Sequence, residues 1–185
     1  SSKRLVELSQ GHAHLLDQVF SLTEESESLP KGVISALENW TDRVYVTDSE
    51  LTRELLFKCT DEKLSGVNLS HPTEYSLTRI DDWAKANKAI KVENYLGLNK
   101  EVLESIADEQ KNELEKLLER VVYIKEVCPQ NLDDIPAGLI LFTKNGTLLT
   151  GGGQIQIPSL GAKGALTRQK EIEKLSSSIE KTEKN

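Results

Sequence analysis

The segment 139–153, LILFTKNGTLLTGGG, holds the strongest local signals of the chain. Residues 139–142 form a short apolar run that is typical of a buried strand. Asn145-Gly146 is the dipeptide favoured in a two-residue type I′ turn, so we expect a hairpin that returns through residues 147–150. Three glycines follow, and glycines permit positive φ and close approach of a second backbone. The segment therefore predicts a hairpin that ends in a loop, a bulge or a contact point for another chain.

The same segment has part of the spacing of a phosphate-binding loop. Gly146 and Gly151 are five residues apart, as in the opening of such a loop. The lysine and the hydroxyl residue that should follow are replaced by Gly152 and Gly153, so the cation that would reach the phosphates is missing. The sequence does not predict nucleotide binding here, although an enzyme with a degenerate glycine loop stays an alternative.

Outward from this segment, the chain shows two similar halves. Apolar residues at helical spacing lead to the strand 44–46 in the first half, and a second such helix leads to the strand 122–124, about 78 residues later. Further expected elements are a strand over 19–22, a helix over 51–59 capped by Thr47 and Glu50, a strand over 67–69, a helix near 81–89, an extended piece near 92–95 and a turn or short helix over 129–135. The expected fold class is α+β (mixed α/β), with two similar lobes in one domain.

Both ends of the chain carry heptad spacing. Leu5, Leu8, His12, Leu15 and Val19 follow one another at intervals of three and four, and Ile172, Leu175 and Ile179 do the same. We therefore expect a coiled-coil segment over 1–18, a globular domain over 19–165 and a second coiled-coil segment over 166–185. We expect the two end helices to pair antiparallel as one arm. The alternative, two ordinary surface helices, is less favoured because both ends carry the heptad spacing.

Composition narrows the classes of function. The chain has 185 residues, with 23 Lys and Arg against 30 Asp and Glu, so its net charge of −7 argues against a protein that mainly grips nucleic-acid phosphates. It has no apolar run long enough to span a membrane. Its two cysteines lie far apart, which fits a reducing compartment and no metal site. The absence of methionine, even at position 1, suggests a piece of a longer protein.

Catalytic motifs are missing as well. His12 and His14 are two residues apart on an expected helix, so they should face different directions and make poor joint metal ligands. His71 stands alone before a proline, and the acidic pairs at 81–82 and 133–134 are ordinary capping chemistry. The sequence therefore predicts no enzyme activity and no cofactor in this chain.

The C-terminal third resembles a known family. The runs 141–149, 151–153 and 164–172 resemble the end of the hinge domain of structural maintenance of chromosomes (SMC) proteins, where a strand and turn lead to glycines and then to the returning coiled coil. In the first half, Ala36-Leu37 and the run 43–48, RVYVTD, resemble the family's corresponding helix and strand. The similarity covers roughly residues 19–175 and is loosest over 73–97.

This resemblance implies a dimerisation hinge from a divergent bacterial protein, which closes two coiled-coil arms. Such hinges dimerise two-fold through strand edges, which makes a homodimer the expected partner state and gives the candidate interface positions Gly151, Gly152, Gly153, Gly161 and Gly164. Weak, salt-sensitive DNA contact is implied at Lys163, Arg168 and Lys170. ATP and magnesium would bind in head domains outside this chain, accessory subunits would bind elsewhere, and the location would be cytoplasmic at the nucleoid. The rival from another class is a non-chromosomal coiled-coil scaffold with an α/β interaction module.

Overall fold

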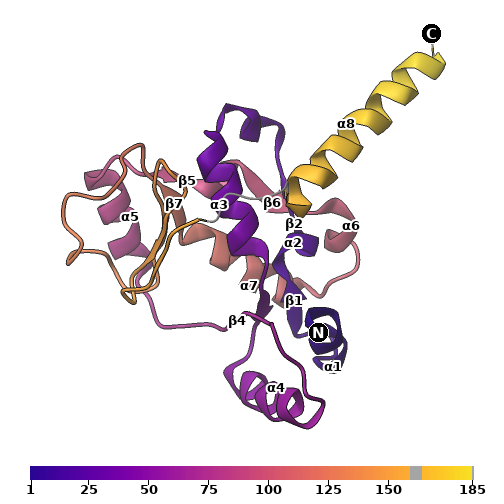
Figure 1. The fold of residues 1–185 in the computed structure, drawn as a ribbon, viewed down its shortest axis with the longest axis horizontal. Coiled ribbons are helices and arrows are strands. Elements are labelled where there is room, and N and C mark those ends of the chain that lie inside the picture. Colours follow the sequence, from indigo (N-terminus) through magenta and orange to yellow (C-terminus); the bar gives the residue numbers. More distant parts are fainter. Residues whose placement is uncertain (159–163, 185) are drawn as a thin grey trace.

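A computed structural model describes residues 1–158 and 164–184 as two lobes with a projecting C-terminal helix (Figure 1). Lobe 1 is built on the sheet β1-β3-β4, whose strands are β1 (Ala13–Leu15), β3 (Val44–Val46) and β4 (Leu69–Ser70). In this sheet β1 is antiparallel to β3 and β4 is parallel to it. Helices α1 (Ser2–Leu8) and α4 (Ser49–Asp61) complete lobe 1.

Lobe 2 is built on the five-stranded sheet β10-β9-β8-β7-β5. Its strands are β5 (Ile90–Lys91), β7 (Val121–Tyr123), β8 (Ile140–Phe142), β9 (Leu148–Thr150) and β10 (Ile155–Gln156). Here β5 is antiparallel to β7 and β8 is parallel to it, so β5-β7-β8 repeats the arrangement of β1-β3-β4. The prediction of two similar lobes is confirmed, and the hairpin β9-β10 is the extension found in lobe 2.

A third, two-stranded sheet joins the halves. Strand β2 (Phe20–Leu22) pairs antiparallel with β6 (Leu96–Leu98). Helices α3 (Lys31–Thr41) and α7 (Asp108–Glu119) follow in the two halves, and both bury apolar faces in one central cluster. Trp40 lies at its centre, stacked on Phe20 and edge-on to Phe142, with ring centroids 6.4 and 6.3 Å apart. The core is thus shared by both halves of the sequence.

Burial supports the predicted repeat distance of about 78 residues. Tyr45 and Tyr123 both pack in the central cluster. Their neighbours face the other way: Val44 and Val46 lie in the cluster under lobe 1, and Val122 and Ile124 lie in the cluster of lobe 2. Because side chains alternate between the two faces of a strand, matching the two tyrosines places equivalent residues on equivalent faces.

Several local predictions need correction. Helix α4 begins after Asp48, whose carboxylate accepts the Glu50 amide at 2.9 Å, while Thr47 bonds elsewhere. The hairpin turn is not the two-residue type I′ form, because Asn145 is outside the positive-φ region and only Gly146, at φ 83°, adopts it. The segment near 92–95, expected to be extended, is instead the 3-10 helix η2 (Val92–Asn94). The other differences are small: helix α5 spans Leu77–Ala86 and residues 129–135 form turns and bends. The structure also contains the 3-10 helix η1 (Glu24–Ser28) and the helix α6 (Lys100–Leu103).

The predicted coiled-coil segment over 1–18 is wrong. Residues 2–19 form α1, β1 and the short helix α2 (Leu16–Val19), and the chain turns after α1 through Gln10 and Gly11, both at positive φ. Leu5 and Leu15 are buried in lobe 1 because β1 pairs with β3. Apolar residues that fit a heptad thus serve a globular core, and this segment forms no antiparallel pair with the C-terminal helix.

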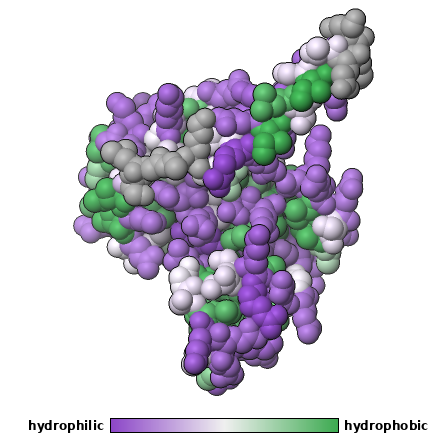
Figure 2. Space-filling model, turned by 45° about the vertical axis from the view of Figure 1, so that its right-hand side comes forward, coloured by the Kyte–Doolittle hydropathy of each residue, from purple (hydrophilic) through white to green (hydrophobic). Residues whose placement is uncertain are grey.

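The C-terminal helix α8 (Ala165–Lys184) lies where the second coiled-coil segment is predicted and projects from the body (Figure 1). Its first turn is anchored, since Leu166 is buried in the central cluster. Further along, apolar side chains remain on the surface (Figure 2), and Ile172, Leu175 and Ile179 are each about 60% exposed. That this stripe pairs in a coiled coil stays a prediction. None of the described helices combines the length and apolar character needed to cross a membrane.

A polar network ties lobe 1 to α7. His14 Nε2 lies 3.0 Å from Gln110 Oε1, which also accepts the Thr47 hydroxyl at 2.8 Å, and Gln110 Nε2 lies 3.2 Å from His12 Nδ1. Burial lowers the pKa of His14, and the nearby His12 lowers it further against the opposing effect of the Gln110 bond. The two histidines reach one partner because His14 lies in a strand, where residues two apart share a face. The expectation that they face different directions is therefore wrong.

Candidate dimer interface

A groove of about 800 Å³ lies between the two lobes, and a sheet edge flanks it on each side. Ser70 of β4 and the following His71 line one side, and Ile155 and Gln156 of β10 line the other. Among the described residues, 1–158 and 164–184, strands β4 and β10 each have a hydrogen-bonded neighbour on one side only, so each presents a free edge. A free edge carries unpaired backbone donors and acceptors that can pair with another chain.

Strand β10 adds exposed apolar side chains to its edge. Ile155 is 60% exposed and Ile157, which follows it by two residues, is 79% exposed. Residues two apart along an extended segment point to the same side. Natural sheet edges usually avoid exposed apolar residues because they promote pairing between chains. The edge of β10 therefore has the composition of a contact surface.

The predicted interface glycines have different surroundings. Gly151 donates its amide to Leu139 O at 2.9 Å, and a Cβ there would overlap the Pro136 carbonyl oxygen. Gly153 occupies the tight turn before β10 at φ 83°. Gly152 is exposed, and the nearest atom to a Cβ there is Thr150 Oγ1 at 3.8 Å. Gly152 and Gly153 are exposed and leave room for another backbone, whereas Gly151 is packed against its own chain.

The other two candidates lie further on. Gly164 lies against the Glu38 side chain, with which a Cβ would collide. Gly161 lies outside the described residues. The sequence could not separate these roles, because the contacts of Gly151 and Gly164 come from segments distant along the chain. That any of the five glycines touches a partner stays a prediction.

Substitutions at the glycine turn test which of its glycines the folded protomer requires. Gly151→Ala is expected to lower the free energy of unfolding by about 1–3 kcal/mol, because the new methyl group forces Pro136 to move. Gly152→Ala is the matched control and should leave the protomer's stability within about 0.5 kcal/mol, since its surroundings are open. Urea titration followed by circular dichroism measures both. If both variants lost the same free energy of unfolding, the close contact between Gly151 and Pro136 would not be the reason that position 151 requires a glycine.

Two of the predicted basic residues, Arg168 and Lys170, lie at the base of α8. Lys170 Nζ donates to Thr23 O at 2.9 Å and to Ser26 Oγ at 2.6 Å, so its ammonium holds α8 to η1. Arg168 is exposed. Its charge opposes the effect of burial, which raises the pKa of both Asp17 and Glu38. Lys163 lies outside the described residues.

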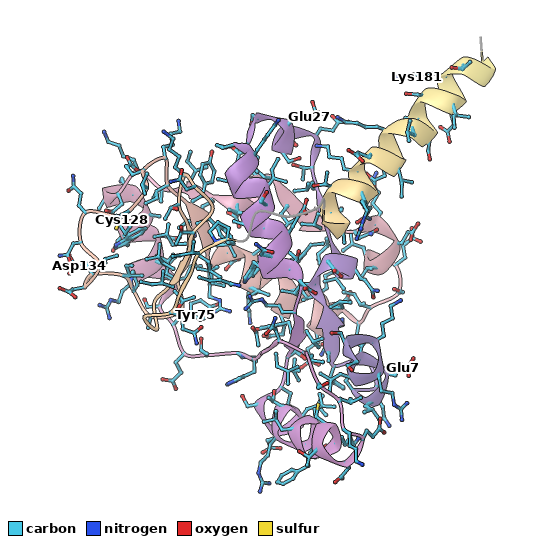
Figure 3. The ribbon with its side chains drawn as sticks, in the orientation of Figure 1. Glu7, Glu27, Tyr75, Cys128, Asp134 and Lys181 are labelled. Carbon is cyan, nitrogen blue, oxygen red and sulfur yellow. The ribbon has the colours of Figure 1, made fainter. Side chains whose placement is uncertain are left out.

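Acidic residues around these cations complete the anchor of α8. Lys174 forms an ion pair with Glu27, which lies beside the helix in Figure 3, and the bond from Lys174 lowers the pKa of Glu27. Thr167 donates its hydroxyl to the Glu38 carboxylate. The sequence signal for this contact was the set of acidic residues in η1, which is matched by lysines in α8.

Other site chemistry is limited. The residues between Gly146 and Gly151 include strand β9 rather than a phosphate-binding loop before a helix. Within the ranges 1–158 and 164–184, no three His, Cys, Asp or Glu side chains gather in a way that could hold a metal ion.

Comparison with known proteins identifies the fold. No family model and no curated protein matches the chain. The SMC hinge domain of Geobacillus stearothermophilus, crystallised as an asymmetric dimer, has a TM-score of 0.54 at 13% identity, over 99% of this chain and 74% of that chain. The hinge domain of the Pyrococcus furiosus SMC protein has a TM-score of 0.48 at 15% identity, over 88% of this chain and 84% of that chain. The first of these likenesses shows that this chain has the SMC hinge fold.

Proposed function

We propose that this chain is a dimerisation hinge of an SMC protein and joins two copies through their sheet edges. The observation that carries the proposal is the pair of free edges, β4 and β10, on opposite sides of one groove. The hinge fold and the crystallised dimer of the Geobacillus hinge support it. The exposed Ile155 and Ile157 supply apolar surface for the contact.

A two-fold dimer uses both edges at once. If β4 of one copy pairs with β10 of its partner, the symmetry axis produces the same pairing a second time. Each pairing would continue the three-stranded sheet of one copy into the five-stranded sheet of the other. Both free edges flanking the groove would then be covered, so the assembly would stop at two copies.

Cross-linking tests this pairing. We expect Ser70→Cys combined with Gln156→Cys, in a chain that also carries Cys59→Ser and Cys128→Ser, to form a covalent dimer under mild oxidation. Paired strands bring Cα atoms within the reach of a disulfide. Each single cysteine variant is the matched control and should stay largely uncross-linked. A dimer that resists cross-linking in the double variant, and in variants shifted by one residue, would place the interface elsewhere.

The base of α8 supports a weak DNA contact. Arg168 is exposed, whereas Lys170 is engaged with η1 and the chain's net charge is −7. We expect salt-sensitive binding of duplex DNA that Arg168→Glu abolishes and that Arg79→Glu, on α5, leaves unchanged. Fluorescence anisotropy at low and physiological salt measures it. Tight binding that survives both salt and the combination of Lys163→Glu with Arg168→Glu would contradict this placement.

The wider role follows from the same proposal. The hinge would not itself catalyse a reaction, and it would hold the arms of a chromosome-organising ATPase whose ATP- and magnesium-binding heads lie in other parts of a longer protein. Its place would be the cytoplasm at the nucleoid, with accessory subunits bound elsewhere. The rival scaffold function predicts a monomer or an assembly that depends on another partner. A nucleotide-using enzyme predicts thermal stabilisation by nucleotide.

A further inference from the structure

Arg120 is a buried cation in the wall of the inter-lobe groove. It lies between the end of α7 and the start of β7, and its carbonyl accepts the Ile140 amide at 3.0 Å. Only 6% of the residue is exposed, yet it lines the groove. An arginine is rarely so buried without a counter-charge, because removing a guanidinium from water costs free energy that an anion or several hydrogen bonds must offset.

The described part of the chain compensates this charge incompletely. Arg120 Nη1 makes two long bonds to neutral oxygens, Thr73 Oγ1 at 3.3 Å and Gly138 O at 3.4 Å. The guanidinium carbon lies 4.8 Å from the ring centroid of Tyr75, which Figure 3 labels. Arg120 Nε is buried and has no hydrogen-bond partner among the residues that the structure describes. No ion pair links Arg120 to a carboxylate in residues 1–158 and 164–184.

The unused donors form a complete binding edge. Nη1 is engaged, and neither Nε nor Nη2 makes a hydrogen bond within the described ranges 1–158 and 164–184. This side of a guanidinium carries two parallel N–H groups that match two oxygens of one anion. A buried donor without a partner is uncommon in folded proteins and calls for an acceptor. The geometry of the free edge thus specifies an acceptor with two oxygens.

A second arginine lines the same groove. Arg43 precedes β3 as Arg120 precedes β7. Its Nε donates to Trp40 O at 2.5 Å and its Nη1 to Ser70 Oγ at 3.4 Å. Arg43 is half-buried, and this burial lowers the pKa of its guanidinium against the opposing charge of Asp42. Two cations in one groove favour a negatively charged ligand.

We propose that the inter-lobe groove binds a phosphate or carboxylate group on the Nε–Nη2 edge of Arg120, with Arg43 as the second cation. The proposal does not rest on the hinge function. The anion has two possible sources, a free small ligand or a carboxylate side chain carried by a second copy of the chain. Glu74 also lines the groove, and it is a competing source within the same chain that the test must separate.

Nuclear magnetic resonance of the arginine side chains tests the proposal on the unmodified protein. The chain has six arginines, so the Nε–Hε signals are few, and Arg120→Lys assigns the signal of interest. In phosphate-free buffer, we expect inorganic phosphate or succinate to shift the Arg120 Nε–Hε signal saturably. A shift that follows protein concentration without added anion would identify the second copy as the source. A signal that neither treatment moves would overturn the proposal.

Variants add a second readout. Arg120→Lys keeps the charge but loses the paired N–H groups, so phosphate affinity measured by calorimetry should fall about tenfold or more. Arg79→Lys is the matched control and should bind phosphate as the wild type does. Glu74→Gln should bind phosphate at least as tightly; if it instead removes the shift, Glu74 organises the site and the assignment to the Arg120 edge is wrong. Unchanged affinity in Arg120→Lys would equally overturn it.

Discussion

The variant with Ile155→Asp and Ile157→Asp is expected to be a monomer at concentrations where the wild type is a dimer. Both side chains are mostly exposed in the protomer, so their replacement removes little from its own stability. In the proposed dimer each copy contributes one β10 edge, and the change therefore acts twice. Losing the burial of four isoleucine side chains, even in part, should weaken association at least about a thousandfold. Size-exclusion chromatography with light scattering measures the change.

Leu56→Asp is the matched control for this variant. Leu56 is 53% exposed on α4, in lobe 1, and it does not line the groove. Its replacement introduces the same charge on a similarly exposed apolar side chain, and the dimer should persist. Dissociation by Leu56→Asp, with a dimer retained in the double isoleucine variant, would move the interface to α4 and refute the pairing through β10.

Trp40→Ala is expected to have the largest effect on folding, lowering the free energy of unfolding by about 3–5 kcal/mol. Trp40 is 2% exposed and packs between Phe20 of the first half and Phe142 of the second. Truncation leaves a cavity in the cluster that both lobes share. Urea unfolding followed by circular dichroism gives the size of the loss.

The distribution of this loss tests the shared core. Trp83 is 7% exposed and belongs to the separate cluster of lobe 2, so Trp83→Ala is the matched control. Hydrogen exchange should accelerate in both β3 and β7 in the Trp40 variant, and mainly in lobe 2 in the Trp83 variant. Acceleration confined to lobe 1 in the Trp40 variant would show that the halves fold independently.

Local periodicity predicted the centre of each half. The helices that became α3 and α7 and the strands β3 and β7 were expected from apolar spacing, because their buried faces repeat at the period of the element itself. The repeat of about 78 residues was visible in the matching strands 44–46 and 122–124, and it predicted the two-lobed architecture that the structure confirms.

The same reasoning failed where distant segments decide the structure. Heptad spacing at the N-terminus fits a coiled coil and a buried helix-strand unit equally well, and the positive φ of Gly11 and the pairing of β1 with β3 decide between them. The contact of Gly151 with Pro136 likewise has no local signal. The groove arginines had no such signal, because Arg43 and Arg120 do not coincide in the repeat that matches Tyr45 with Tyr123, and only the folded chain shows that both line one groove.

Sedimentation equilibrium of the unmodified chain tests the central claim most directly. The protomer mass is 20.6 kDa, and the proposed hinge predicts a species of twice that mass at about 10 µM, with reversible dissociation on dilution. A single species of 20.6 kDa at all concentrations up to about 50 µM would contradict the account, because the free edges of β4 and β10 would then not join two copies.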